Sequence, residues 1–191
     1  MKRLLLVTLA ALALHFSALA QLETWELSAL TGVTAGSVNA STVGANITTG
    51  VLSRGAGVVA SSQTGGYSSN TWFNSATPTT LADAIAGNKY YQFTLPVSTC
   101  FNASITTVQI SLRSSNTGPN TATLRSSLDG FVGNLGTVTV TATDVLYTFN
   151  VNSTGSGTIT FRLYGYGSAV SGTPGTGGTL RIGPLTGNDL I

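Results

Sequence analysis

The segment from residue 158 to residue 166 alternates strictly between apolar and polar side chains. One side of it carries Ile159, Phe161 and Leu163, and the other carries Thr160, Arg162 and Tyr164. A two-residue period is typical of a β-strand that buries one face. Threonine, isoleucine and aromatic residues also suit a pleated, half-buried surface. We therefore expect this segment to be a central strand of a β-sheet.

Other segments of the chain have the same character and are separated by turn residues. They cover residues 24–27, 47–54, 89–95, 105–113, 122–126, 137–140, 145–149 and 179–182. About eight to ten short strands with turns between them are typical of an all-β sandwich or barrel. One short helix is expected near residues 81–87, because Thr80 can cap it, Asp83 lies in its first turn and Gly87 can end it.

The first 20 residues have the pattern of a secretory signal peptide. Lys2 and Arg3 form a positive start, an apolar run follows, and Ala18-Leu19-Ala20 is a small-residue cleavage site. The apolar run is too short to span a bilayer comfortably. We expect residues 21–191 to be a single secreted or cell-surface domain with no membrane span. Leu190-Ile191 is apolar with no turn after it, which suggests a domain truncated near a final strand.

The remaining composition excludes several classes of function. Of eight Lys and Arg residues, two lie in the leader, so residues 21–191 carry as many basic as acidic side chains. A nucleic-acid-binding protein would need a basic surplus. The one histidine, His15, is also in the leader, which excludes Ser-His-Asp and Cys-His nucleophiles and histidine zinc sites. A glycosidase with two carboxylates remains formally open, but the six acids are scattered, so we expect neither an enzyme nor a cofactor.

Cys100 is the only cysteine, so no disulfide can form within the chain. A lone cysteine in an exported protein is either buried or available for pairing between chains. The apolar neighbours Val97 and Phe101 favour burial.

Three stretches together resemble a known family. They are residues 81–95, residues 124–131, and residues 161–166 with 178–182. The chain resembles, over residues 81–182, the jelly-roll-like β-sandwich domains of secreted and cell-surface proteins of bacteria, of the kind common in Bacteroidota. The resemblance implies a two-sheet antiparallel β-sandwich, an extracellular location and a shape like that of a carbohydrate-binding module. It implies no catalytic residues.

The candidate ligand-binding residues are outward-facing arginines and aromatic residues. Arg113, Arg125, Arg162 and Arg181 all lie on the polar side of their strands. If two of them share a sheet, they form a donor-rich face for carboxylates or sugar hydroxyls; otherwise they only keep a nearly uncharged surface soluble. The aromatic candidates are Trp72, Tyr164 and Tyr166, although large aromatic residues more often fill a core. The predicted site comprises Trp72, Arg125, Arg162, Tyr164 and Tyr166.

Asp129-Gly130 is interpreted mainly as a turn, with Asp129 as a candidate calcium ligand because Ca²⁺ prefers oxygen atoms. Two hypotheses for the whole chain follow. In the first, it is a secreted, non-catalytic module that binds carbohydrate or another extracellular surface ligand. In the second, it is a structural or adhesive subunit that self-associates through an open sheet edge.

Overall fold

A computed structural model describes residues 21–31, 36–183 and 189–190, so the predicted signal peptide lies outside the described residues. The described strands are β1 (Glu23–Thr24), β2 (Val38–Asn39), β3 (Thr42–Val43), β4 (Val51–Arg54), β5 (Val59–Ala60), β6 (Tyr67–Asn70), β7 (Tyr90–Pro96), β8 (Ala103–Ser114), β9 (Pro119–Ser126), β10 (Gly136–Thr139), β11 (Val145–Gly155), β12 (Thr158–Ala169) and β13 (Leu180–Ile182). A helix, α1 (Leu81–Ala86), and a 3-10 turn, η1 (Ser127–Asp129), complete the elements.

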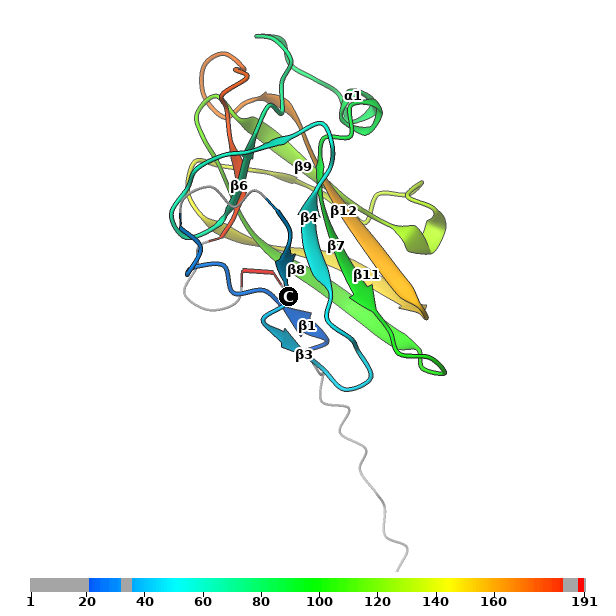
Figure 1. Ribbon diagram of the computed structural model, residues 1–191. Coiled ribbons are helices and arrows are strands. Elements are labelled where there is room, and N and C mark those ends of the chain that lie inside the picture. Colours follow the sequence, from blue (N-terminus) through cyan, green and yellow to red (C-terminus); the bar gives the residue numbers. More distant parts are fainter. Residues whose placement is uncertain (1–20, 32–35, 184–188, 191) are drawn as a thin grey trace, which may run out of the picture.

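Two antiparallel sheets pack face to face (Figure 1). The six-stranded sheet has the order β10-β9-β12-β7-β4-β2, and the five-stranded sheet has the order β11-β8-β13-β6-β5. From β7 to β9 and again from β11 to β13, successive strands alternate between the two sheets. The predicted two-sheet antiparallel β-sandwich, with its strands and one short helix, is confirmed.

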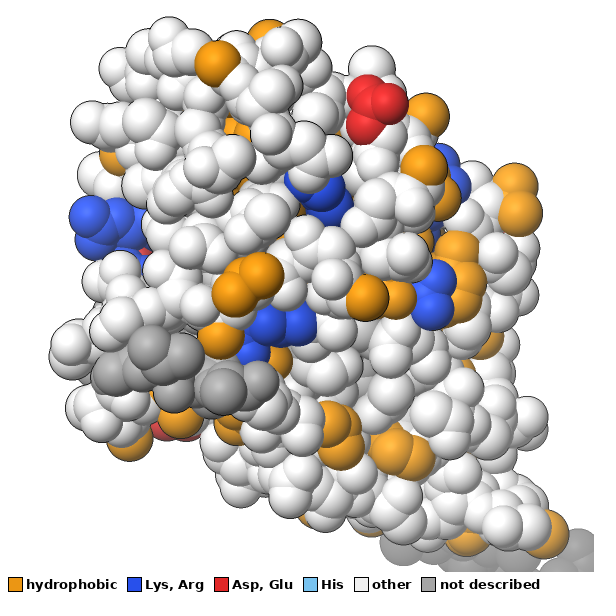
Figure 2. Space-filling model, turned by 45° about the horizontal axis from the view of Figure 1, so that its top comes forward, with side chains coloured by type: hydrophobic (Ala, Val, Ile, Leu, Met, Phe, Trp, Pro, Cys, Tyr) orange, Lys and Arg blue, Asp and Glu red, His pale blue; other side chains and the backbone are white. Residues whose placement is uncertain are grey.

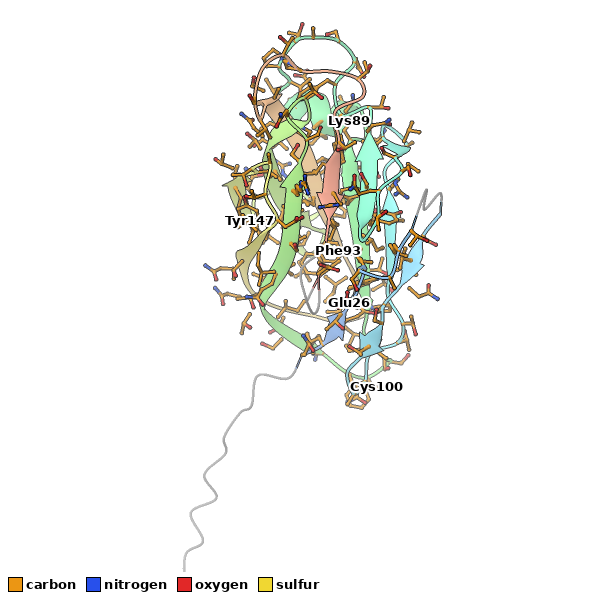
Figure 3. The ribbon with its side chains drawn as sticks, turned by 90° about the vertical axis from the view of Figure 1, so that its left-hand side faces the viewer. Glu26, Lys89, Phe93, Cys100 and Tyr147 are labelled. Atoms are coloured by element: carbon orange, nitrogen blue, oxygen red, sulfur yellow. The ribbon has the colours of Figure 1, made fainter. Side chains whose placement is uncertain are left out.

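The segment that opened the sequence analysis is β12, and it lies inside the six-stranded sheet between β9 and β7. Its apolar side chains, Ile159, Phe161 and Leu163, are buried as predicted. Phe161 stacks on Phe93 of β7 with ring centroids 5.1 Å apart, and Trp25 meets Phe93 edge-on at 6.1 Å. Figure 3 shows Phe93 inside the sandwich. Burying each such ring contributes about 2–3 kcal/mol to folding, so these aromatic residues stabilise the core beneath the six-stranded sheet.

Helix α1 begins with the predicted cap. The Thr80 side chain accepts a hydrogen bond from the Asp83 backbone N–H, and the Asp83 carboxylate accepts one from the Thr80 backbone N–H at 2.8 Å. This reciprocal capping box satisfies two backbone donors that the first turn would otherwise leave unpaired. The helix packs against β12. It is the only helix besides η1 among the described residues, and no described helix has the length and hydropathy needed to cross a membrane.

Several short strands were not predicted, and β6 shows why. Its sequence is Tyr67-Ser68-Ser69-Asn70, which lacks the apolar alternation of a strand. Its two serines are nevertheless buried, because β6 lies between β13 and β5. Arg54, reaching across from β4, donates to the Ser69 hydroxyl and the Ser68 carbonyl. Long-range neighbours therefore make this polar segment a strand.

The expectation that Cys100 is buried is wrong. Cys100 is exposed in the turn between β7 and β8, with a positive φ of 69°. Figure 3 shows it at one end of the sandwich. The neighbouring Phe101 is also exposed, so it provides no apolar cover.

Exposure makes Cys100 chemically accessible. We expect a maleimide reagent to label the folded protein to completion without denaturant, because the thiol needs no unfolding to react. Intact-mass spectrometry checks this. Labelling that requires urea would contradict the exposed placement.

Candidate functional site

The four predicted outward arginines do not gather at one place. They form two neighbouring pairs, one on each sheet. Arg125 of β9 and Arg162 of β12 are directly paired across the six-stranded sheet, whereas Arg113 of β8 and Arg181 of β13 are paired across the five-stranded sheet. Two arginines therefore share a sheet in both places, but Arg181 is only 5% exposed, so the expectation that all four arginines lie on the surface is wrong for Arg181.

The pair on the six-stranded sheet lies among aromatic rings. The Arg162 guanidinium lies 4.2 Å from the centroid of the Phe131 ring and 4.6 Å from that of Tyr90. Its Nε donates to the Gln92 side-chain oxygen at 3.0 Å. Cation–π contacts of this kind contribute about 0.5–2 kcal/mol and fix the plane of the guanidinium. We call Tyr90, Gln92, Arg125, Phe131 and Arg162 the arginine–aromatic face.

Arg125 holds in place the loop that carries Phe131. Its Nε donates to the Asn134 side-chain oxygen at 2.7 Å, and its Nη1 donates to the Phe131 carbonyl at 2.8 Å. The loop therefore lies against the sheet next to Arg162 and holds the Phe131 ring beside its guanidinium.

The Asp129-Gly130 turn precedes this loop and is confirmed. Gly130 has a φ of 73°, a left-handed conformation that glycine adopts without strain. The Asp129 carboxylate accepts hydrogen bonds from the backbone N–H groups of Val132 at 3.3 Å and Gly133 at 2.7 Å. In the described parts of the chain, no three His, Cys, Asp or Glu side chains cluster around one point. Asp129 thus has a structural part in shaping the loop.

Two further residues of the predicted site, Tyr166 and Tyr164, differ in their exposure. Tyr166 is half-buried on β12, and its hydroxyl is 2.9 Å from that of Thr123 on β9. Tyr164 is only 2% exposed, so its predicted availability to a ligand is wrong. Tyr90 packs edge-on against it at 5.3 Å, and α1 packs against the same strand. The alternation along β12 shows which side Tyr164 takes but not what covers that side.

Trp72 is fully buried, which also contradicts a ligand contact there. Its indole N–H donates to the Ser69 carbonyl at 2.7 Å, and its ring meets Tyr91 edge-on at 5.2 Å. Trp72 therefore belongs to the core, the other role considered for it from the sequence.

Sequence reasoning missed Tyr90, Gln92 and Phe131 as parts of the face. The alternation of residues 89–95 was a usable signal, because it places Tyr90 and Gln92 on the side opposite the buried Tyr91 and Phe93. What the alternation lacks is the order of strands, which brings β7 beside β12. Phe131 comes from a loop and had no such signal.

The arginine–aromatic face keeps unused hydrogen-bond donors. Neither Nη atom of Arg162 is hydrogen-bonded to the described residues, and the same holds for the Gln92 amide nitrogen. Within the described ranges, the two ion pairs both involve Asp144, so neither Arg125 nor Arg162 is neutralised by an acid. The view in Figure 2 shows a mostly uncharged surface with separate patches of basic side chains. Planar donors beside aromatic rings can bind hydroxyl or carboxylate oxygens.

Comparisons with known proteins give a likeness in structure only. No family model matches the chain, and no curated protein matches it. A solved variant of the family 29 carbohydrate-binding module CBM29-2 is 15% identical, covers 85% of this chain and 90% of its own, and has a TM-score of 0.38. Another family 29 carbohydrate-binding module, from Piromyces equi, is 9% identical, with coverages of 80% and 85% and a TM-score of 0.36.

Proposed function

We propose that this protein is a non-catalytic module that binds glycans through the arginine–aromatic face. The observation that carries the proposal is the position of Arg162. Its guanidinium lies over both the Phe131 ring and the Tyr90 ring, and both Nη groups are free of protein acceptors among the described residues. The leader-like sequence of residues 1–20 supports an extracellular setting, where such a ligand would be met.

The chemistry of the face suits a sugar. Sugar hydroxyls accept hydrogen bonds from the guanidinium groups and from the Gln92 amide, and the apolar C–H face of a pyranose packs on an aromatic ring. Because Arg162 is already held by Gln92 and two rings, little side-chain entropy is lost when a ligand binds. The half-buried rings keep an apolar surface beside the donors.

The test is the binding of Arg162→Ala to soluble polysaccharides. We expect the wild-type protein to be retarded by at least one member of a panel of neutral and acidic polysaccharides in affinity electrophoresis. Arg162→Ala is expected to bind that polysaccharide about tenfold or more weakly, equivalent to about 1.4 kcal/mol, because the central donor and the support of both rings are lost.

Gln109→Ala is the matched control, since Gln109 lies on β8 of the opposite sheet and its side chain bonds to the Thr148 side chain and to no other described residue. It should bind as the wild type does. Thermal unfolding of each variant separates a lost contact from a lost fold. Absence of binding by the wild-type protein across the panel, or unchanged affinity of a folded Arg162→Ala, would refute the proposal.

A further inference from the structure

The second arginine pair lines a separate polar hollow on the five-stranded sheet. The hollow has a volume of about 70 Å³. It is lined by Gln63, Arg113, Ser114, Ser115, Thr179 and Arg181. A space of this size holds a few water molecules or a single small polar group. The arginine–aromatic face lies on the other sheet and shares no residue with it.

Arg181 is a buried part of the lining. It is 5% exposed, and its Nη2 donates to both Asp144 oxygens, at 2.9 and 3.2 Å. Its Nε is buried and has no hydrogen-bond acceptor in the described structure. A buried guanidinium with an unsatisfied donor is costly, so this cation is under-compensated by its protein partners.

Arg113 adds a second positive charge at the rim. Its side chain is 47% exposed, and its Nη1 lies 3.7 Å from Asp144, beyond normal hydrogen-bond length. Asp144 is thus the single acid for two arginines, because the described residues contain no other ion pair at this place. The cluster carries one formal positive charge in excess.

The neutral groups of the hollow add donors. The Ser115 hydroxyl oxygen accepts the Thr179 backbone N–H at 2.8 Å, which leaves its own hydrogen free to donate. The Gln63 amide has no hydrogen bond to the described residues and lines the same space. The Ser114 hydroxyl, by contrast, already donates its hydrogen to the Thr179 carbonyl at 2.9 Å.

We propose that this hollow binds one small oxyanion group. The Arg113 guanidinium, the Ser115 hydroxyl and the Gln63 amide are its donors, and Arg181 supplies buried positive charge beneath them. Oxyanions suit such a site because they accept several charge-assisted hydrogen bonds at once. A carboxylate and a sulfate or phosphate share this chemistry. The site does not depend on glycan binding at the other sheet.

The experiment titrates the purified ¹⁵N-labelled protein with sodium sulfate, phosphate and glucuronate in separate arms, with ionic strength held constant by chloride. We expect saturable NMR shifts at the Arg113 Nε–H, the Gln63 side-chain amide and the Ser115 backbone amide. Arg113→Gln should weaken binding by about tenfold or more, since it removes the excess charge. Asp144→Asn should strengthen it several-fold, because it removes a competing carboxylate while keeping an acceptor for Arg181.

Gln109→Ala serves again as the control and should bind as the wild type does. Saturation by glucuronate alone identifies a carboxylate as the group bound, and saturation by sulfate or phosphate identifies a tetrahedral anion; either supports the site. Damaged folding would not raise the affinity for the anion, so tighter binding by Asp144→Asn supports the site even if Arg113→Gln is poorly folded. Linear shifts in all three arms, saturable shifts centred on Arg125 and Arg162, or equal affinities of Arg113→Gln and wild type would overturn the proposal.

Discussion

Replacing Lys89 with methionine is expected to lower the free energy of unfolding by about 3 kcal/mol or more. Lys89 is 4% exposed (Figure 3 shows its position). Its ammonium donates to the Thr71 carbonyl at 2.8 Å, the Trp72 carbonyl at 2.9 Å and the Asn74 side-chain oxygen at 2.7 Å. Methionine fills a similar length but leaves the buried Trp72 carbonyl and the half-buried Thr71 carbonyl without their donor, and an unsatisfied buried acceptor costs about 1–3 kcal/mol.

Burial also lowers the pKa of Lys89, because desolvation disfavours the charged ammonium. The three oxygens that accept its hydrogen bonds oppose this effect. Urea-induced unfolding followed by tryptophan fluorescence measures the effect. Ile85→Met is the matched control, because Ile85 is an exposed apolar residue of α1 and its replacement should change stability by less than about 0.5 kcal/mol. A loss below about 1 kcal/mol in Lys89→Met would show that water replaces the ammonium there.

Lys89 also shows what local sequence can and cannot predict. Lys89 begins a segment whose alternation predicts a strand, β7 in the structure, and nothing in its neighbouring residues marks it as buried. Its partners lie 15 to 18 positions earlier in the chain, in the loop after β6. By contrast, the buried side of β12 and the cap of α1 depend on residues close in sequence, and both were predicted correctly.

The candidate face shows the same division. Alternation along each strand was enough to place Arg125 and Arg162 outside the sandwich. Their pairing depends on β9 and β12 being neighbours in an antiparallel register, which is a property of the whole fold. Tyr164 has the same alternation as Arg162, yet it is buried because Tyr90 packs against it and α1 lies against its strand. Local sequence therefore predicts on which face of a strand a side chain lies. Whether solvent reaches that side chain depends on elements that are distant in the sequence.

The second large effect expected is a fall in stability between about pH 4.5 and pH 7 that depends on Glu23. Glu23 of β1 is 4% exposed and borders an apolar cavity of about 50 Å³ between the sheets. The other residues that line this cavity are Leu22, Trp25, Phe93, Leu95, Ile105, Val108 and Phe161. Its Oε1 accepts the Gly50 backbone N–H, but its Oε2 has no hydrogen-bond partner in the described structure. Burial raises the pKa of Glu23 from 4.5 to about 7, and no Lys or Arg lines the cavity to oppose this.

The sign follows from proton binding. Between the unfolded pKa of about 4.5 and the folded pKa of about 7, the folded state holds a proton on Glu23 that the unfolded state has released. Raising the pH through this window therefore weakens folding, by about 3 kcal/mol, and above it the loss is constant. Asp83 acts in another window, because the Thr80 backbone and hydroxyl lower its pKa, so its contribution is lost only as the pH falls below about 4.

Glu23→Gln keeps the acceptor for Gly50 and removes the titration. The variant should show no fall between pH 4.5 and pH 7 and should be more stable than the wild type at pH 8, as measured by urea unfolding at half-unit steps of pH. Glu26→Gln is the matched control three residues away (Figure 3), since Glu26 is only half-buried and accepts a bond from the Ser28 N–H. It should retain the wild-type slope. A flat wild-type profile, or a slope that Glu26→Gln removes as well, would show that the Glu23 carboxylate is hydrated or is not the group that titrates.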